Sequence, residues 1–259
     1  MNRFDNKVVI ITGAGGGLGR ASAIRAAQEG AKLSLVDLNE ESLKQTKDLI
    51  LKETPEADVL LITADVSKES DVENYVNHTV QKFNKIDGFF NNAGIEGKPE
   101  LTADYRSDVF EKVIEINLNG VFYGMKHVLK VMKEQKSGAI VNTASDAGVR
   151  GHSNMSAYSA SKHGVIGLTR TAAVEYGEYG ISINAIAPWA IFTNMVESAM
   201  KQMVPKNWEE LAKEAVSSNP MKRFGKPEEV GALVAFLLSE AQFINGTVIN
   251  IDGGMAYKI

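Results

Sequence analysis

The sequence predicts an α/β protein built on a doubly wound parallel sheet of about seven strands, with helices on both faces. Two observations indicate this fold class. Short apolar runs alternate with longer segments whose apolar residues recur at helical spacing, and no proline-, glycine- or serine-rich linker divides the chain. Strands that alternate with helices pair in parallel through right-handed crossovers, which place helices on both faces of one sheet. We therefore expect one domain spanning residues 1–259.

Seven short apolar runs are predicted to be buried strands because polar or turn-forming residues bound each of them. In chain order they are Lys7–Thr12, Lys32–Val36, Asp58–Thr63, Ile86–Phe90, Ala139–Thr143, Ile181–Ile186 and Thr247–Ile251. Between them, apolar residues at i, i+3, i+4 and i+7 predict helices, for example around Leu43 and Ile50 and around Val109 and Val113. Ligands of such sheets bind beyond the carboxyl ends of the strands, so functional residues are expected there.

One stretch, residues 188–220, fits this alternation poorly. It follows the sixth predicted strand and contains both tryptophans of the chain, Trp189 and Trp208. A long insertion at the carboxyl end of a strand is a typical position for a lid over a substrate, and we prefer this interpretation. The alternative is a structural excursion whose methionine and tryptophan side chains pack on the core.

Composition excludes several classes of function. The 259 residues include 32 acidic and 28 basic side chains, a net charge of −4, and no basic run stands out, so no nucleic-acid partner is expected. The absence of cysteine excludes disulfides, a thiol nucleophile and a cysteine-ligated metal. His78, His127, His152 and His163 show no metal-ligand spacing, so no metal is predicted. No export signal or run of about 20 apolar residues is visible, which favours a cytoplasmic protein without a membrane span.

A glycine-rich turn separates the first predicted strand from a helix. Glycines let the backbone turn sharply and approach a pyrophosphate closely, and the N-terminus of the helix offers free N–H groups and the positive end of its dipole. The position between strand and helix is the context that supports a dinucleotide site. The residues expected to contact the cofactor are Gly13, Gly16, Gly17, Leu18 and Gly19.

Asp37 ends the second predicted strand, 18 residues after Gly19. A carboxylate at this point can accept hydrogen bonds from both hydroxyls of the adenosine ribose and repels a 2′-phosphate. Neither Gly16 nor Leu38 supplies a cation for such a phosphate. The sequence therefore predicts NAD rather than NADP as the cofactor. In the alternative interpretation, Asp37 only caps the helix that starts near Asn39.

Tyr158 and Lys162 stand four residues apart in a predicted helix, with Ser145 thirteen residues before the tyrosine. Residues at this spacing share one helix face. Free tyrosine has a pKa of about 10, and a neighbouring cation favours the phenolate and lowers that pKa. The pair therefore suits a tuned acid/base. Taken alone, however, this spacing is explained more simply by a solvated pair of side chains on the helix surface.

Further motifs occur in order along the chain. They are Thr12-Gly13-x-x-x-Gly17-x-Gly19, Asp65-Val66, Asn91-Asn92-Ala93-Gly94, Asn117, Ser145, Tyr158-x-x-x-Lys162 and Asn184-Ala185-x-Ala187-Pro188. In this order they resemble the short-chain dehydrogenase/reductase family over essentially the whole chain. The resemblance implies a Rossmann fold, a nicotinamide cofactor and a homotetramer. The helices near 108–132 and 156–178 would supply one interface.

The resemblance also implies roles for single residues. Tyr158 would be the general acid in ketone reduction and the base in alcohol oxidation. Lys162 would hold the nicotinamide ribose and lower the pKa of Tyr158. Ser145 would bind the substrate oxygen, and Asn117 would hold a water that links Lys162 to solvent. The further cofactor contacts it implies are Asp65, Val66, Asn92, Ala93, Gly94, Pro188, Ile191 and Thr193.

The chain departs from the family pattern after Pro188, where Trp189 replaces the usual glycine. We expect this ring to narrow the substrate pocket and to favour flat or ring-shaped apolar ketones. Asp146 could bind a polar group of the substrate or pair with Arg150, and both readings stay open. The remaining candidates for the substrate pocket are His152 and Met195.

The function predicted from these residues is an NAD(H)-dependent oxidoreductase that interconverts a ketone and a secondary alcohol, with a small cyclic or apolar substrate. The alternative is an NAD-binding regulatory protein on the same fold without turnover. A nonredox lyase or epimerase with a bound nicotinamide is a third reading. Its products would form without net change in NADH.

Overall fold

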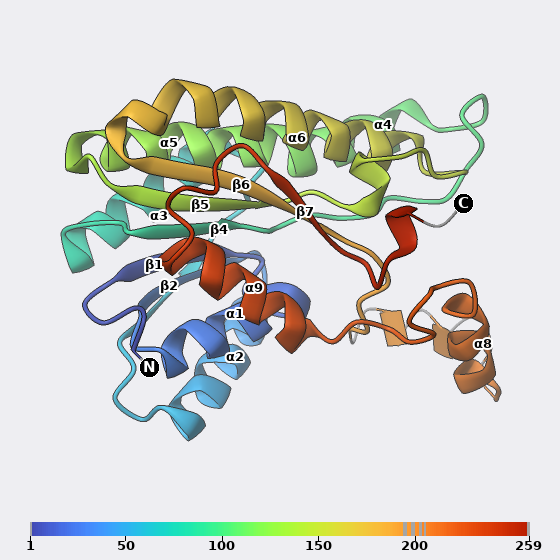
Figure 1. Ribbon diagram of the computed structural model, residues 1–259, viewed down its shortest axis with the longest axis horizontal. Coiled ribbons are helices and arrows are strands. Elements are labelled where there is room, and N and C mark those ends of the chain that lie inside the picture. Colours follow the sequence, from blue (N-terminus) through green and yellow to red (C-terminus); the bar gives the residue numbers. More distant parts are fainter. Residues whose placement is uncertain (1, 194–195, 198–199, 202–203, 205, 258–259) are drawn as a thin grey trace.

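The computed structural model describes residues 2–257 except 194–195, 198–199, 202–203 and 205. Seven strands form one parallel sheet in the order β3-β2-β1-β4-β5-β6-β7 (Figure 1). Their bounds are β1 Val8–Thr12, β2 Lys32–Asp37, β3 Val59–Thr63, β4 Gly88–Asn91, β5 Gly138–Thr143, β6 Ile181–Pro188 and β7 Val248–Ile251. All seven predicted strands and the doubly wound architecture are confirmed, with ends that differ by at most two residues.

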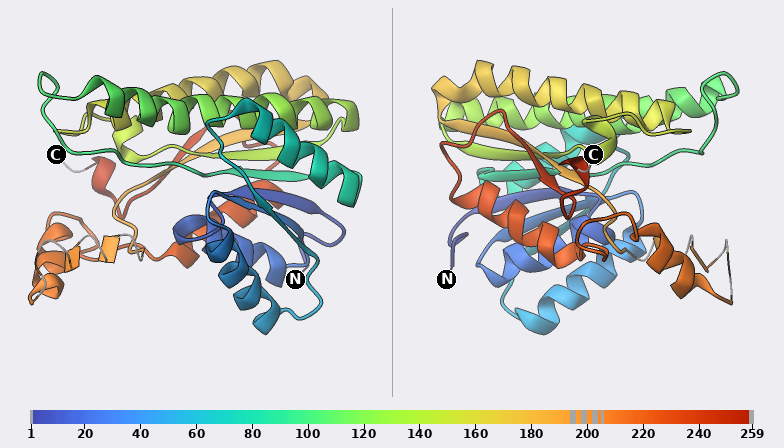
Figure 2. Two further views of the ribbon diagram at one scale, coloured as in Figure 1. Left: turned by 180° about the vertical axis from the view of Figure 1, so that it is seen from behind. Right: turned by 45° about the vertical axis from the view of Figure 1, so that its right-hand side comes forward.

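Helices cover both faces of the sheet (Figure 2). These helices are α1 Gly17–Gln28, α2 Glu40–Glu53, α3 Glu69–Phe83, α4 Ser107–Ile114, α5 Gly120–Gln135, α6 Ser156–Tyr176 and α9 Pro227–Ser239, whereas α8 Trp208–Ala215 lies away from the sheet. One core cluster joins α1, α2 and α9 to the sheet, and a second joins α3, α5 and α6 to its other face. Because both faces are covered, the central strands read as continuous apolar runs, as in the fully buried Val8–Thr12.

The order of the strands creates the crevice in which a ligand binds. The chain builds β1, β2 and β3 outward in one direction and then returns to place β4 against the other side of β1. The connections that leave β1 and β4 therefore diverge at the carboxyl ends of these two strands. A doubly wound sheet binds its ligands at this switch point.

The segment after β6 lies to one side of the sheet, where β6 ends, and carries α8 (Figure 1). Its aromatic side chains contact one another. The Phe192 ring stacks on Trp208, with centroids 6.3 Å apart, and meets Phe224 edge-on at 5.4 Å. Hydrogen bonds from Phe192 N to Gly225 O and from Gly225 N to Ala190 O close the base of the segment.

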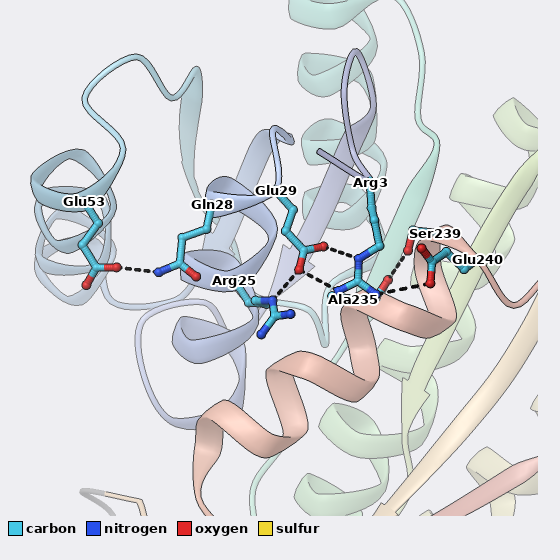
Figure 3. A network of polar contacts seen from close by, with 8 residues as sticks. All are labelled: Arg3, Arg25, Gln28, Glu29, Glu53, Ala235, Ser239 and Glu240. Carbon is cyan, nitrogen blue, oxygen red and sulfur yellow. Dashed lines mark hydrogen bonds and ion pairs between the residues drawn. The ribbon is translucent and has the colours of Figure 1, made fainter. Parts of the chain in front are cut away.

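A network of ion pairs ties the N-terminal residues to the ends of α1 and α9 (Figure 3). The guanidinium of Arg3 donates to both carboxylate oxygens of Glu29 at 2.6 Å, and Arg25 donates to the same carboxylate. Arg3 also reaches Glu240 just after α9, at 3.5 Å. Glu29 is 7% exposed. The network lies at the amino end of the sheet, since Glu29 follows the C-terminus of α1 and precedes β2.

Candidate active site

A cavity of about 590 Å³ lies at the carboxyl ends of the central strands. It brings together predicted residues from five separate parts of the chain. The predicted residues that line it are Gly13, Gly16, Gly17, Leu18, Asp37, Asn92, Ala93, Gly94, Tyr158, Lys162 and Thr193. The glycine loop and the tyrosine–lysine pair therefore share one cavity. The sequence alone could not establish this, because about 140 residues separate the two motifs.

The glycine loop is shaped by close contacts that only glycine permits. Gly13 adopts a φ of +65°, and a Cβ there would lie 2.9 Å from Asn92 Nδ2. A Cβ on Gly19 would lie 2.1 Å from Gly13 O, so this glycine lets α1 pack against the loop without lining the cavity. The first turn of α1 holds no acidic residue and no side chain caps its N-terminus. Its free N–H groups suit an anion such as a pyrophosphate.

Asp37 is held beside the glycine loop by two backbone N–H groups. Its Oδ2 accepts a hydrogen bond from Gly15 N at 2.9 Å, and its Oδ1 accepts one from Asn39 N at 3.0 Å. The cap of α2 is Asn39, whose side chain accepts from Ser42 N, so Asp37 does not serve as that cap. A carboxylate has about four acceptor positions. One position on each oxygen remains for a ribose hydroxyl.

Arg20 is a cavity residue that the sequence did not reveal. Its Nε donates to Thr46 Oγ1 at 2.9 Å, and its Nη2 donates to Gly15 O and, at 3.3 Å, to Ser42 O. Thr46 is fully buried and donates in turn to Ala14 O at 2.8 Å. The peptide of Gly15 is thus held on one side by Asp37 and on the other by Arg20.

The sequence also missed other residues that line the cavity. These are Gly15, Ser42, Gln45, Ile95, Glu96 and Thr143. Ile95 and Glu96 directly follow the Asn-Asn-Ala-Gly motif, and Thr143 ends β5, so their position at strand ends was an available signal. Ser42 and Gln45 lie on α2, and nothing in the sequence indicates which face of that helix meets the loop.

Tyr158 and Lys162 lie together on α6, with Lys162 Nζ 5.6 Å from the centre of the tyrosine ring. Nζ donates to Thr143 O at 2.7 Å, and the residue is 3% exposed. Burial lowers the pKa of Lys162 to about 8. Burial also raises the pKa of Tyr158 to about 12, against a smaller downward effect of its hydrogen bond with Ser145, and the charge of Glu96 raises it further. The net shift of the Tyr158 pKa in this structure is therefore upward, opposite to the predicted lowering, because burial outweighs the hydrogen bond with Ser145.

Asn117 is fully buried in a π-helical turn, Glu115–Asn119, between α4 and α5. Its side chain exchanges hydrogen bonds with the backbone of Ile95, at 2.8 Å in each direction, and donates to Ser161 Oγ at 3.2 Å. A Cβ on Gly94 would lie 3.0 Å from Asn117 Oδ1 and 3.6 Å from Lys162 Nζ. Asn117 thus lies behind the cavity wall, close to Lys162, rather than in the wall itself.

The remaining predicted residues lie outside this cavity. Asp65 accepts from Ser67, and this hydrogen bond lowers the pKa of its carboxyl, while Val66 packs beside Gly120. Trp189 and Ile191 line a separate cavity of about 120 Å³ that does not include Tyr158. Pro188 ends β6, and Met195 falls outside the described residues.

The substrate-side candidates Ser145, Asp146 and His152 form one connected group. Ser145 Oγ accepts from Ala147 N at 3.2 Å, which shapes the short turn Asp146–Gly148. Asp146 pairs with Arg150, as one of the two sequence readings expected, and also with His152. Within the described residues, no group of His, Asp or Glu could hold a metal ion. No helix of the same residues is long and apolar enough to cross a membrane.

Known proteins identify the family. A family model described as enoyl-(acyl carrier protein) reductase matches residues 13–256. Levodione reductase from Leifsonia aquatica is 56% identical over 255 residues, which cover 98% of this chain and 96% of that protein. The chain belongs to the short-chain dehydrogenase/reductase family. The crystal structure of levodione reductase matches with a TM-score of 0.96, covering 99% of this chain and 100% of the other.

More distant members of the short-chain dehydrogenase/reductase family share the whole fold. Cyclohexanol dehydrogenase from Acinetobacter sp. (strain SE19) is 39% identical over 258 residues, which cover 99% of this chain and 98% of that protein. A structure of NAD⁺-bound xylitol dehydrogenase is 38% identical, with a TM-score of 0.89 and coverage of 97% and 99%. The predicted family and its enzyme class, an oxidoreductase, are confirmed. The stretches Gly88–Lys98 and Glu175–Pro188 look like levodione reductase, and the overall identity confirms that likeness.

Proposed function

We propose that this chain is an NAD(H)-dependent oxidoreductase that interconverts a ketone and a secondary alcohol. The observation that carries the proposal is the single cavity that holds the glycine loop, Asp37, Tyr158 and Lys162. The similar proteins support it, since they are named levodione reductase and cyclohexanol dehydrogenase, and both names refer to ring compounds. A small cyclic ketone or alcohol is therefore the substrate class that we propose.

NAD fits the residues present. The free N–H groups at the start of α1 suit the pyrophosphate, and Asp37 keeps one acceptor position on each oxygen for the adenosine ribose. The predicted cofactor is confirmed for the family by the NAD⁺-bound relative. When bound, NAD(H) supplies the hydride chemistry, and the protein supplies position and electrostatics.

In ketone reduction, negative charge develops on the carbonyl oxygen, so hydrogen-bond donors aimed at that oxygen lower the barrier. The Tyr158 hydroxyl donates its proton to this oxygen, and the Ser145 hydroxyl donates a second hydrogen bond to it. With a pKa of about 12, Tyr158 carries its proton at neutral pH and is ready to act as the acid. In alcohol oxidation Tyr158 first loses its own proton to solvent; its phenolate, stabilised by the Lys162 ammonium, then accepts the proton of the alcohol.

We assign the remaining roles on the family pattern. Asn117 would hold a water that links Lys162 to solvent, and the closeness of both side chains to Gly94 supports this role. Thr193 lines the cavity beside Gly17 and would contact the nicotinamide end of the cofactor. The other proposed contacts are Asp65, Val66, Pro188 and Ile191. We also propose that residues 188–220 form a lid over the substrate, although 194–195, 198–199, 202–203 and 205 lie outside the described residues.

We propose that the protein acts in the cytoplasm as a homotetramer. Support for the assembly comes from large apolar side chains on the outer faces of the long helices. Phe110 on α4 is 37% exposed, Phe122 on α5 is 46% exposed and Val174 on α6 is 86% exposed. Light scattering coupled to gel filtration measures the assembly directly, and a monomeric mass contradicts the assignment.

The function is tested by incubating the protein with NADH and a panel of cyclic and open-chain ketones while absorbance near 340 nm is followed. We expect oxidation of NADH with cyclic ketones, and Tyr158→Phe should lose about 10³-fold in kcat while still binding NADH. Binding of NADH by calorimetry without turnover of any ketone or alcohol would support a regulatory protein instead. Product formed without net consumption of NADH would support a lyase or epimerase.

A further inference from the structure

Asp146 is a buried carboxylate placed directly after Ser145. The residue is 2% exposed. Three donors converge on its Oδ2: Arg150 Nε at 2.8 Å, Arg150 Nη2 at 2.7 Å and His152 Nε2 at 2.7 Å. Its Oδ1 has no hydrogen-bond partner among the described residues. A buried carboxylate is costly unless it is paired, so these contacts are needed to keep it in place.

The contacts of Asp146 connect three segments around the Ser145 turn. The turn itself is closed by hydrogen bonds from Gly148 N to Ser145 O and from Arg150 N to Asp146 O. Arg150 also donates to Met255 O at 3.3 Å, which links the turn to the C-terminal residues. His152 fixes the loop that leads into α6 and Tyr158. One carboxylate thus links the Ser145 turn to the loop that precedes α6 and, through Arg150, to the C-terminal residues.

The turn also presses against the helix that carries the acid/base pair. A Cβ on Gly148 would lie 2.8 Å from the backbone oxygen of Lys162. The turn therefore has little room to shift toward α6, and the ion pairs of Asp146 restrain it further. The Ser145 side chain is near enough to Tyr158 to lower the pKa of its hydroxyl, although burial has the larger, opposite effect.

We propose that Asp146 is a positioning residue that acts through Ser145, an inference that rests on the proposed ketone–alcohol chemistry. It holds the Ser145 hydroxyl where it meets the substrate oxygen together with Tyr158. Arg150 and His152 are its anchors. A displacement of about 1 Å at such a donor lowers turnover by about 10²-fold.

A double-mutant cycle tests this role. We expect Asp146→Ala to lower kcat for ketone reduction by about 30-fold. The kcat of Asp146→Asn should lie between those of the wild type and Asp146→Ala. KM for the ketone should be nearly unchanged in both variants. In a Ser145→Ala background the same substitution should change kcat by less than about 2-fold, because the residue that it positions is gone. Calorimetry should give the same Kd for NADH within about 2-fold in every variant.

Glu29→Gln is the matched control, since Glu29 is also a buried carboxylate held by two basic side chains, but at the amino end of the sheet. It should leave kcat unchanged in both backgrounds. A loss at Asp146 of equal size with and without Ser145 would overturn the proposal. If Asp146→Ala instead raises KM for the ketone and leaves kcat unchanged, the proposal is also overturned, and Asp146 Oδ1 accepts a hydrogen bond from the substrate.

Hydrogen exchange separates this proposal from the proposed function. In Asp146→Ala the amides of residues 147–150 should exchange at least about 10-fold faster than in the wild type, whichever substrate the enzyme uses. Unchanged exchange there overturns the positioning role even if the enzyme is active. Faster exchange in a protein that turns over no ketone or alcohol supports the restraint on the turn and refutes the proposed function alone.

Discussion

Glu29 and Lys162 are buried ionisable residues at opposite ends of the same sheet. The surroundings of Glu29 favour its charged form, whereas those of Lys162 favour its neutral form. Burial alone would raise the pKa of Glu29, but hydrogen bonds from Arg3 and Arg25 outweigh it and lower that pKa. Lys162 donates to one backbone oxygen, and burial lowers its pKa to about 8. The amino end of the sheet thus favours the charged form of its residue, and the carboxyl end disfavours it.

This difference in how the two pKa values shift distinguishes a charged group that stabilises the fold from one that serves function. Paired charges such as Arg3 and Glu29 fasten the chain terminus to the domain. An unpaired ammonium at the end of β5 costs stability and is useful only when something else approaches it, here the substrate oxygen and Tyr158. Perturbed pKa values of this kind cluster at functional sites. Substitutions at the two ends should therefore separate stability from activity.

The largest expected effect is at Lys162. Lys162→Met should lower kcat by about 10³-fold because the cation that stabilises the reacting oxygen and the phenolate is lost. The same substitution should raise the Tm at pH 7 by about 5 °C, since it removes a buried charge that costs roughly 2–3 kcal/mol. Scanning calorimetry and steady-state kinetics on one preparation measure both. A lower Tm together with lost activity contradicts the comparison.

The pH dependence of that stabilisation follows from the direction of the shift. Lys162 has a pKa of about 8 in the folded protein and about 10.4 when unfolded. Below pH 8 it is charged in both states and the folded state carries the full cost. As pH rises from 8 to 10.4 the folded state is already neutral, so wild-type stability increases and the advantage of Lys162→Met should disappear. A constant difference in Tm between pH 6 and pH 10 would show that burial of charge is not the cause.

Some features of the two ends of the sheet can be predicted from the sequence, and others become visible only in the folded structure. The seven strands follow from their apolar runs, and the glycine loop, Asp37, Tyr158 and Lys162 follow from local spacing. The contacts of Arg20 do not, because they depend on how α2 packs beside the loop. The direction of the Tyr158 pKa also escapes the sequence, since it depends on burial rather than on the neighbouring lysine. Glu29 is one of many acidic residues until folding brings Arg3 beside it.

Asp37 tests the adenosine side of the functional end. Asp37→Ala should reduce the ratio of kcat/KM for NAD over NADP by about 100-fold, because each hydrogen bond to a charged group contributes about 1.5–3 kcal/mol. Arg20 lines the same cavity and, like Asp37, contacts Gly15, so it is the cation that we expect to attract a 2′-phosphate. Initial rates with both cofactors measure the ratio. A wild-type enzyme that prefers NADP would refute the NAD assignment before any substitution is made.

Arg20 tests whether the glycine loop must be held in shape. Arg20→Met removes the donors to Gly15 O, Ser42 O and Thr46 Oγ1. We expect the Kd for NADH to rise about 10-fold, equal to about 1.4 kcal/mol, while kcat at saturating cofactor changes less than about 2-fold. Arg25→Met is the control on the same helix, since Arg25 contacts Glu29 instead. If Arg20→Met and Arg25→Met raised the Kd for NADH equally, the cause would be a perturbation of α1 rather than of the glycine loop.

The smallest effect on activity is expected at Glu29. Glu29→Gln should leave kcat within about 2-fold of wild type but lower the Tm at pH 7 by about 5 °C, because it leaves Arg3 and Arg25 without their shared carboxylate and costs roughly 2 kcal/mol. The folded-state pKa lies below the unfolded value of about 4.3, so this stabilisation is complete above that value and is lost as pH falls through the folded pKa. The Tm difference between wild type and variant should therefore shrink below pH 4, whereas the Lys162→Met difference shrinks above pH 8. The two Tm differences should therefore shrink at opposite ends of the pH range, because one site favours the charged form of its residue and the other disfavours it. If both differences shrank over the same pH range, this comparison of the two sites would be contradicted.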